Sequence, residues 1–224
     1  MVRADYTTID GRKACETVIK GSRFIGIASP VTDEPELRSF LADVRTEFPE
    51  ATHYCYAAVF GGSSYIERFS DDCEPSDTAG RPILGVIRAH KLTDTAIVVV
   101  RYFGSTLLGR GGLVHAYSGA AVAVIGICGI KEVRMCSSFA VTIPYQDYNR
   151  FMKIMTPLFA SPPECEYAVD VRIVVHVTED RTAEFEKAMM EFSGGKLFAV
   201  PLGTGYLRSP RTEKNTVISP RLSR

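Results

Sequence analysis

The sequence predicts an α+β protein built from two domains. Its 224 residues, 46% of them apolar, suffice for two small domains that each bury a core. The run TAIVVVRYF, residues 95–103, is apolar and rich in β-branched residues, which is typical of a central strand covered on both faces. After Gly129 the pattern starts again and indicates the order strand, helix, strand, strand, helix, strand.

The N-terminal half begins with strands and a helix. Two β-rich runs within residues 13–31 flank a Lys-Gly-Ser turn, which predicts a hairpin. Residues 33–48 place apolar side chains at helical spacing, with one proline near the start and another after the end, so a helix is predicted there. The segment HYCYAAVF, residues 53–60, predicts the next strand.

Two further helices are expected in this half. One follows the acidic loop at residues 70–82 and runs to about His90. The other covers residues 113–127, which are apolar almost all round, so this helix should be buried. A glycine and three alanines between residues 119 and 123 should let it lie close to the sheet.

The C-terminal half is expected to fold as a ferredoxin-like βαββαβ unit. The expected elements are strands at residues 137–145, 164–177 (a tight pair) and 196–202, and helices at residues 145–159 and 178–192. Thr178 is the expected cap of the last helix.

These patterns divide the chain into an N-terminal domain of residues 1–137, a C-terminal domain of residues 138–203 and a tail of residues 204–224. The tail is rich in Pro, Ser, Arg and Lys, and carries five basic residues against one acidic residue. It is expected to be a basic, mobile arm.

Composition limits the function classes. Lys and Arg balance Asp and Glu at 26 each, so no overall field draws the protein to nucleic acid or to a membrane. The sequence shows no charged-then-apolar leader and no long uncharged apolar run, which predicts a soluble, cytoplasmic protein. The six cysteines are scattered without a CxxC pair, so reduced thiols are expected rather than zinc ligands or a disulfide framework.

The stretch SDDCEPSDTAGRP, residues 70–82, raises the question of a site. Its acids are Asp71, Asp72, Glu74 and Asp77. Several carboxylates close together suit an oxygen-ligated cation or an acid/base pair, but their spacing does not follow a calcium loop. No metal and no cofactor are expected. The pattern favours a helix start, with Asp77 or Thr78 as the cap.

The Gly-rich turn within RYFGSTLLGRGGLVHAY, residues 101–117, is the second candidate. Its candidate residues are Gly109, Gly111, Gly112, Arg101 and Arg110. Glycines allow close approach to the backbone, and the N–H groups at a helix start attract anions. The turn is neither a Walker loop nor a dinucleotide fingerprint. Phosphate binding and a tight structural turn both remain open.

His53 and Cys55 fall on one face of their strand, because side chains alternate along a strand. A Cys/His nucleophile is one hypothesis, although cysteines in β-rich segments are mostly small core residues. If the protein is an enzyme, these two residues and the loop acids Asp72 and Glu74 are its candidate catalytic residues. No nucleophile elbow or zinc-protease signature is present, which favours a non-enzymatic role.

Three blocks of the sequence together resemble the signature of the IMPACT/YigZ family. They are HYCYAA, SDDCEPSDTAGRPI and VVVRYFGSTLLGRGGLVHAY, in that order, within residues 15–127. Residues 138–203 are similar to the small C-terminal domain of the bacterial and archaeal YigZ members. The resemblance implies an N-terminal domain with the left-handed βαβ topology of a small-subunit ribosomal protein and of elongation factor G. It also implies a ferredoxin-like domain that resembles another elongation-factor domain.

The family resemblance also implies a function. Eukaryotic IMPACT members restrain a starvation-activated kinase of translation initiation by competing for its activator, and nucleic-acid or ribosome binding is the usual inference for prokaryotic members. We therefore expect a non-enzymatic regulator of translation and stress response, whose partner is RNA, the ribosome or a translation-regulating protein. The residues expected to meet phosphate or nucleic acid are Arg81, Arg101, Arg110, Gly109, Gly111 and Gly112. The arginines alternatively neutralise the loop acids.

Two other function classes remain as alternatives. The first is an enzyme that acts on a small phosphorylated or peptide substrate. The second is a protein-interaction module whose partner recognises the C-terminal domain. No membrane partner is expected.

Three residues depart from the family pattern. The family usually has glycine where Cys73, Asp77 and Ser105 stand in this sequence. Cys73 and Asp77 place side chains at flexible positions of the acidic loop, so its shape is expected to differ. Asp77 also adds negative charge beside the expected anion site.

Overall fold

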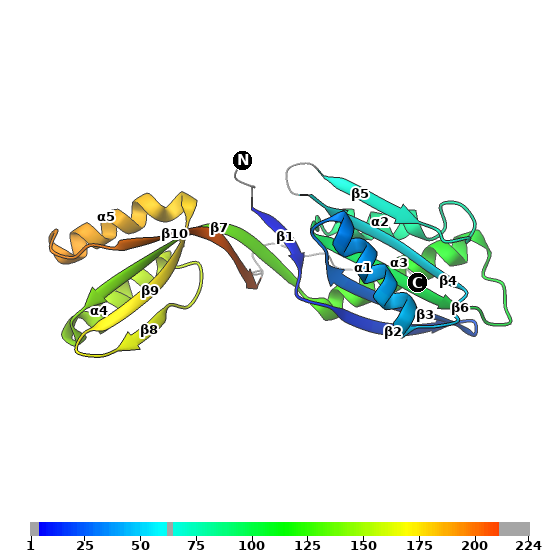
Figure 1. Ribbon diagram of the computed structural model, residues 1–224, viewed down its shortest axis with the longest axis horizontal. Coiled ribbons are helices and arrows are strands. Elements are labelled where there is room, and N and C mark those ends of the chain that lie inside the picture. The colour runs from blue at the N-terminus through cyan, green and yellow to red at the C-terminus, as the bar shows by residue number, and fades with distance from the viewer. Residues whose placement is uncertain (1–4, 62–64, 211–224) are drawn as a thin grey trace, which may run out of the picture.

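The computed structural model describes residues 5–61 and 65–210, which form two five-stranded sheets with helices packed on them (Figure 1). Five α-helices lie in these ranges, so the fold is mixed α and β as expected. The two sheets belong to separate lobes, and the long strand β7 (Ile130–Ile143) runs from one lobe into the other.

The N-terminal sheet has the strand order β2-β3-β6-β4-β5, and all neighbouring strands are antiparallel. Its strands are β2 (Lys13–Ile19), β3 (Ser22–Pro30), β4 (His53–Phe60), β5 (Ile66–Ser70) and β6 (Thr95–Tyr102). The hairpin expected within residues 13–31 and the strand expected at residues 53–60 are confirmed. The pattern does not predict β5, a short edge strand that pairs only with β4.

Helices cover both faces of this sheet. Helix α1 (Glu34–Glu47) packs on one face, and α2 (Gly80–Ala89) and α3 (Gly109–Cys128) pack on the other. Strand β6 lies in the middle of the sheet, and its residues 96–100 are fully buried. The expectation of a central strand covered on both faces is confirmed, and it explains the apolar run.

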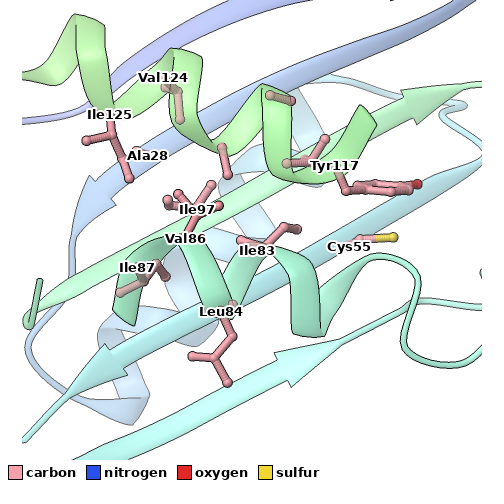
Figure 2. Packing of buried hydrophobic residues seen from close by; sticks show 14 of the residues in the cluster. Ala28, Cys55, Ile83, Leu84, Val86, Ile87, Ile97, Tyr117, Val124 and Ile125 are labelled. Carbon is pink, nitrogen blue, oxygen red and sulfur yellow. The ribbon is translucent and has the colours of Figure 1, made fainter. Parts of the chain in front are cut away.

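Figure 2 shows the core beneath α2 and α3. Ile83 and Ile87 of α2 and Val124 of α3 belong to the same buried cluster as Ile97 of the central strand. Helix α3 lies very close to the sheet at Gly26 of β3, where an added Cβ would lie 2.7 Å from a main-chain oxygen of the helix. Glycine on the strand and alanines on the helix therefore set this spacing.

Helix α1 begins where the sequence indicates. The carboxylate of Asp33 accepts a 2.8 Å hydrogen bond from the N–H of Glu36, which satisfies a free donor at the helix start. Pro35 lies in the first turn, where its missing N–H costs nothing. Leu37, Phe40 and other apolar side chains of one face are buried against the sheet.

Helix α3 is not buried on all sides, which corrects the expectation for residues 113–127. Its inner face is buried, but Val114, Val122 and Ile127 on the outer face are exposed. The reason is its position in an outer layer, where only one face of a helix meets the sheet. Among the described helices, α3 alone has the length and mean hydropathy, 1.6, of a membrane span, and part of it is buried inside the protein.

The second sheet has the order β1-β7-β9-β8, with β10 also paired to β7. Its other strands are β1 (Tyr6–Ile9), β8 (Glu164–Tyr167), β9 (Val171–Thr178) and β10 (Val200–Pro210), and its helices are α4 (Tyr145–Met155) and α5 (Thr182–Ser193). From β7 onward the elements follow in the order βαββαβ, and all strand pairs are antiparallel. One apolar cluster joins the sheet to the two helices.

Two boundaries and one helix cap differ from the sequence-based expectations. The expected division between residues 137 and 138 falls inside β7, because one strand serves both lobes. Residues 204–210, expected in the tail, belong to β10; residues 211–224 lie outside the described residues. Thr178 makes no side-chain cap, because the short 3-10 turn Glu179–Arg181 precedes α5.

Strand β1, which the pattern does not predict, ties the N-terminal segment to both lobes. It pairs with residues 130–133 of β7. The hydroxyl of Thr7 donates to the carbonyl of Lys91 at 2.6 Å, and that of Thr8 donates to the carbonyl of Asp94 at 3.1 Å. Four residues are too few for a periodic signal, so these long-range contacts alone define the strand.

We predict that a chain ending after Ser137 unfolds cooperatively. It retains the whole N-terminal sheet, α1 to α3, and the part of β7 that pairs with β1. Thermal unfolding followed by circular dichroism should show one transition. A chain ending after Gly129 also lacks the partner of β1 and should melt at a lower temperature. If the chain ending after Ser137 is soluble only with residues 138–210 present, the N-terminal lobe is not an independent domain.

Candidate functional site

The acidic loop, residues 70–82, packs beside the Gly-rich turn at residues 104–112. A guanidinium nitrogen of Arg110 donates to the carbonyl of Ser76 at 2.8 Å, which joins the two segments directly. Glu74 and Pro75 from the loop also line a hollow together with residues of the turn. The two sequence blocks therefore form one surface.

Asp71 organises the acidic loop. Its carboxylate accepts hydrogen bonds from the N–H groups of Asp77, Ala79 and Gly80 at 2.9, 3.0 and 2.8 Å. It thus caps α2 from outside the helix. The expected caps are wrong: Thr78 donates its hydroxyl to the carbonyl of Pro75, and Asp77 pairs with an arginine.

Asp72 attaches the loop to the start of β4. Its carboxylate accepts a 2.7 Å hydrogen bond from the N–H of Tyr54 and a 3.2 Å hydrogen bond from Arg45. Both carboxylate oxygens of Asp72 are therefore engaged within the protein. This arrangement gives Asp72 a structural task, which is to hold the loop against β4 and α1.

The departures from glycine at residues 73 and 77 fall where the backbone is left-handed. Cys73 has φ +69° and Asp77 has φ +65°, a region that glycine occupies without steric cost. This backbone geometry explains why glycine suits both positions. The loop keeps the left-handed turns although both residues carry side chains. Ser105 has no positive φ.

Glu74 is the acceptor at the centre of a buried network. Arg101 of β6 donates to Glu74 Oε1 at 2.5 Å, and the hydroxyl of Tyr117 in α3 donates to the same oxygen at 2.7 Å. The side chains of Glu74 and Arg101 are only 4% and 5% exposed. Burial raises the pKa of Tyr117, so its hydroxyl stays protonated and donates.

His53 and Cys55 contact the same loop from β4. His53 Nδ1 lies 2.8 Å from the carbonyl oxygen of Asp72, and the thiol of Cys55 donates to the carbonyl of Asp71 at 3.0 Å. Burial raises the pKa of Cys55 to about 12, which keeps its thiol protonated at neutral pH. A buried thiol that is protonated at neutral pH disfavours Cys55 as a nucleophile.

A hollow of about 390 Å³ opens between the loop and the turn. Its polar residues are His53, Glu74, Arg101 and Arg110, and its apolar residues are Pro75, Phe103, Leu107, Leu108 and Leu113, with Gly109 between them. Arg101 is also buried against the rings of Phe24 and Phe103, whose centroids lie 5.4 and 5.2 Å from its guanidinium carbon. The hollow thus combines an apolar wall with a charged floor.

The structure brings together only part of the predicted set. His53, Glu74, Arg101, Arg110 and Gly109 all line the hollow. Gly111 and Gly112 lie in the first turn of α3, Cys55 is buried, and Arg81 pairs with Asp77 on the surface. Within the described ranges, no group of three or more His, Cys, Asp or Glu side chains is placed to hold a metal ion.

Sequence reasoning missed Tyr117 and Phe103. The sequence did contain a clue to Tyr117, because a tyrosine inside an apolar helix needs a hydrogen-bond partner for its hydroxyl. Phe103 follows the central strand directly and is 49% exposed, although such an aromatic ring normally packs in a core. Its exposure is visible only in the folded protein.

Comparison with known proteins identifies the family. The Impact N-terminal domain model matches residues 20–125, which include the loop, the turn and the hollow. The chain is 35% identical to the IMPACT family member YvyE of Bacillus subtilis over 85% of this chain and 88% of that protein. The chain belongs to the IMPACT family.

Other family members match over most of the chain. Identity is 46% with an IMPACT family member of Thermus thermophilus, over 81% of this chain and 98% of that protein. It is 30% with the IMPACT family member YigZ of Escherichia coli, over 80% and 89%. A solved structure of a hypothetical protein is 27% identical, with a TM-score of 0.58 over 89% of this chain and 98% of that chain.

We predict opposite effects for two glycines of α2. A Cβ at Gly80 would lie 2.8 Å from main-chain atoms of Ser70, whereas a Cβ at Gly85 would have no atom within 4 Å. Gly80→Ala should lower the free energy of unfolding by about 1–3 kcal/mol through overpacking. Gly85→Ala should raise it by up to about 1 kcal/mol, because alanine is the better helix former. Urea unfolding measures both, and a destabilisation shared equally by the two variants would contradict the close contact.

Thiol labelling tests the nucleophile hypothesis. In the folded protein at pH 8, the exposed Cys73 should react first, while the buried Cys55 should not react because its pKa is raised to about 12. After denaturation without reductant, all six cysteines should titrate, because all are free. Mass spectrometry of the labelled peptides identifies the sites. Rapid modification of Cys55 in the folded protein would restore it as a candidate nucleophile.

Proposed function

We propose that this protein is a non-enzymatic regulator associated with translation, and that it binds RNA through the surface around the hollow. Membership of the IMPACT family supports the association with translation. The observation that carries the RNA-binding role is the position of Arg110. It lies at the edge of the hollow and at the start of α3, where both its charge and the helix N-terminus favour an anion.

The acids of the loop do not oppose an anionic ligand. Asp71 accepts three main-chain hydrogen bonds, and Glu74 is paired with Arg101. Asp72 pairs with Arg45, and Asp77 pairs with the neighbouring Arg81 at 2.7 Å. Each loop carboxylate thus has a hydrogen-bond or ion-pair partner inside the protein, whereas the guanidinium of Arg110 donates to an uncharged carbonyl, that of Ser76.

Binding is favoured over catalysis by what the polar side chains contact. Asp72 is engaged by the main chain of β4, and the thiol of Cys55 stays protonated. The enzyme alternative therefore rests on His53, whose Nε2 lies 3.8 Å from Glu74 Oε1 at the hollow. That pair resembles an acid/base arrangement, but the carboxylate already accepts hydrogen bonds from Arg101 and Tyr117.

The protein-interaction alternative is favoured by a second hollow, in the C-terminal lobe. It has a volume of about 450 Å³ and is mostly apolar, with Met189, Met190, Leu197 and Phe198 among its lining residues. Met190 and Phe198 are 67% and 78% exposed. Exposed apolar side chains around a concave surface are typical of a protein contact.

The proposal also includes the topology of the two lobes and the place in the cell where the protein acts. We infer that α1 makes the left-handed crossover between β3 and β4 that the family resemblance implies. The strand order β10-β7-β9-β8 and the βαββαβ element order support a ferredoxin-like C-terminal lobe. The proposed site of action is the cytoplasm, where ribosomes and reduced thiols are found together.

Co-sedimentation with ribosomes and single-stranded RNA tests the function. Arg110→Ala should weaken binding equally across RNA sequences, because contacts to phosphate carry no base information. Each lost phosphate contact should reduce the slope of log affinity against log salt by about 0.7 on a single strand. Affinity is measured at several salt concentrations for the full chain and the variant.

Two control variants separate this surface from general charge effects. Arg38 is 78% exposed on α1, on the opposite side of the sheet, so Arg38→Ala removes the same charge away from the hollow. Arg208→Ala tests the basic C-terminal segment. If either control loses as much affinity as Arg110→Ala, the hollow is not the RNA site. If neither RNA nor ribosomes are retained at low salt, the proposed function fails.

A further inference from the structure

We propose that the hollow at the start of α3 binds a single nucleotide. Its phosphate lies on the first turn of α3 beside Arg110, and its base lies against Phe103 above the buried Arg101. This inference rests on the proposed function, because it names the part of an RNA chain that the surface recognises. It adds a site for a base to the anion-binding surface around Arg110.

The start of α3 supplies the phosphate site. Leu108, at the N-cap position, makes no side-chain cap hydrogen bond, and the first turn contains no acid. The first N–H groups of any α-helix have no partner within the helix, and the helix dipole favours negative charge there. Arg110 adds a full positive charge in the same turn.

Gly111 makes this turn approachable. A Cβ at Gly111 would have no atom within 4 Å, so internal packing does not demand a glycine there. A glycine inside a helix costs stability relative to alanine. The missing side chain leaves the backbone open to close approach by a phosphate group.

The floor of the hollow supplies a polar contact for the base. Arg101 is 4% exposed, and its Nε–H has no hydrogen-bond partner among the residues that the structure describes. A buried donor without a partner is costly, and this nitrogen has almost no accessible surface of its own, so a ligand gains binding energy where its entry brings an acceptor to it. The imidazole nitrogen Nε2 of His53, 3.8 Å from Glu74 Oε1, is a second polar nitrogen beside the same floor.

The wall of the hollow favours a base over an aliphatic side chain. The ring of Phe103 is 49% exposed and lies over the guanidinium of Arg101. Nucleobases stack on such rings and also carry acceptor atoms at their edges. An aliphatic peptide side chain would fill the apolar wall but leave the Nε–H of Arg101 unpaired. The volume of about 390 Å³ is in the range of small-ligand sites.

Titration of the full chain with AMP and with inorganic phosphate tests the inference. AMP should bind more tightly than phosphate by the stacking contribution of its base. Phe103→Leu should weaken AMP about 5- to 150-fold and leave phosphate unchanged, since stacking on an aromatic ring accounts for that range. Phe69→Leu is the matched control, because Phe69 is also exposed beneath an arginine but lies outside the hollow.

A second pair of variants tests the phosphate end without a risk of misfolding. Gly111→Ala and Gly119→Ala both replace a glycine of α3 whose added Cβ meets no atom within 4 Å, so both should maintain or raise the melting temperature. Only Gly111→Ala should weaken AMP and phosphate together. Equal binding by the two variants would overturn the placement of the phosphate.

The outcomes separate this inference from the proposed function. If the protein retains RNA but AMP binds no better than phosphate, or Phe103→Leu has no effect, the base site is wrong while RNA binding stands. If AMP binds as expected and ribosomes and RNA are not retained, the nucleotide site stands and the proposed function fails. If a short apolar peptide with a free carboxylate displaces AMP and binds more tightly, the hollow is a peptide site and the inference is overturned.

Discussion

The pairing of Arg101 with Glu74 is the interaction on which the N-terminal lobe depends. Arg101 stands on the central strand, directly after five fully buried apolar residues. A buried charge is strongly unfavourable without a partner, and removing one member of a buried pair costs about 3–5 kcal/mol, against less than about 1 kcal/mol for an exposed pair. The acidic loop must therefore bring Glu74 to this strand.

The position of Glu74 at the central strand determines where the other residues of the acidic loop lie. Once Glu74 is at the strand, Asp71 lies where its carboxylate caps α2, and Asp72 lies where it meets β4. Tyr117 brings α3 to the same carboxylate oxygen. One ion pair thus joins a loop, two strands and two helices, and the hollow is the space that remains beside it. The three sequence blocks of the family supply these pieces in order.

Strand β7 has the corresponding role between the lobes. Its first residues pair with β1 and β10, and its last residues pair with β9. The middle of β1 is held by hydrogen bonds from Thr7 and Thr8 to residues 91 and 94 of the N-terminal lobe. The connection between the lobes is therefore a piece of sheet and not a flexible linker, although each lobe has an apolar cluster of its own.

The sequence by itself determined the elements with strong local patterns: the central strand, the first hairpin, α1 and the order of elements after Gly129. It also indicated the two segments that line the hollow, because their glycines, acids and arginines are unusual for simple connections. Only the tertiary structure decided that Asp71 and not Asp77 caps α2, and that a terminal guanidinium nitrogen of Arg101 pairs with Glu74. It also decided which face of α3 is exposed. These outcomes depend on contacts between residues far apart in the chain, and a local pattern of charge or hydropathy carries no information about which distant group will be the partner.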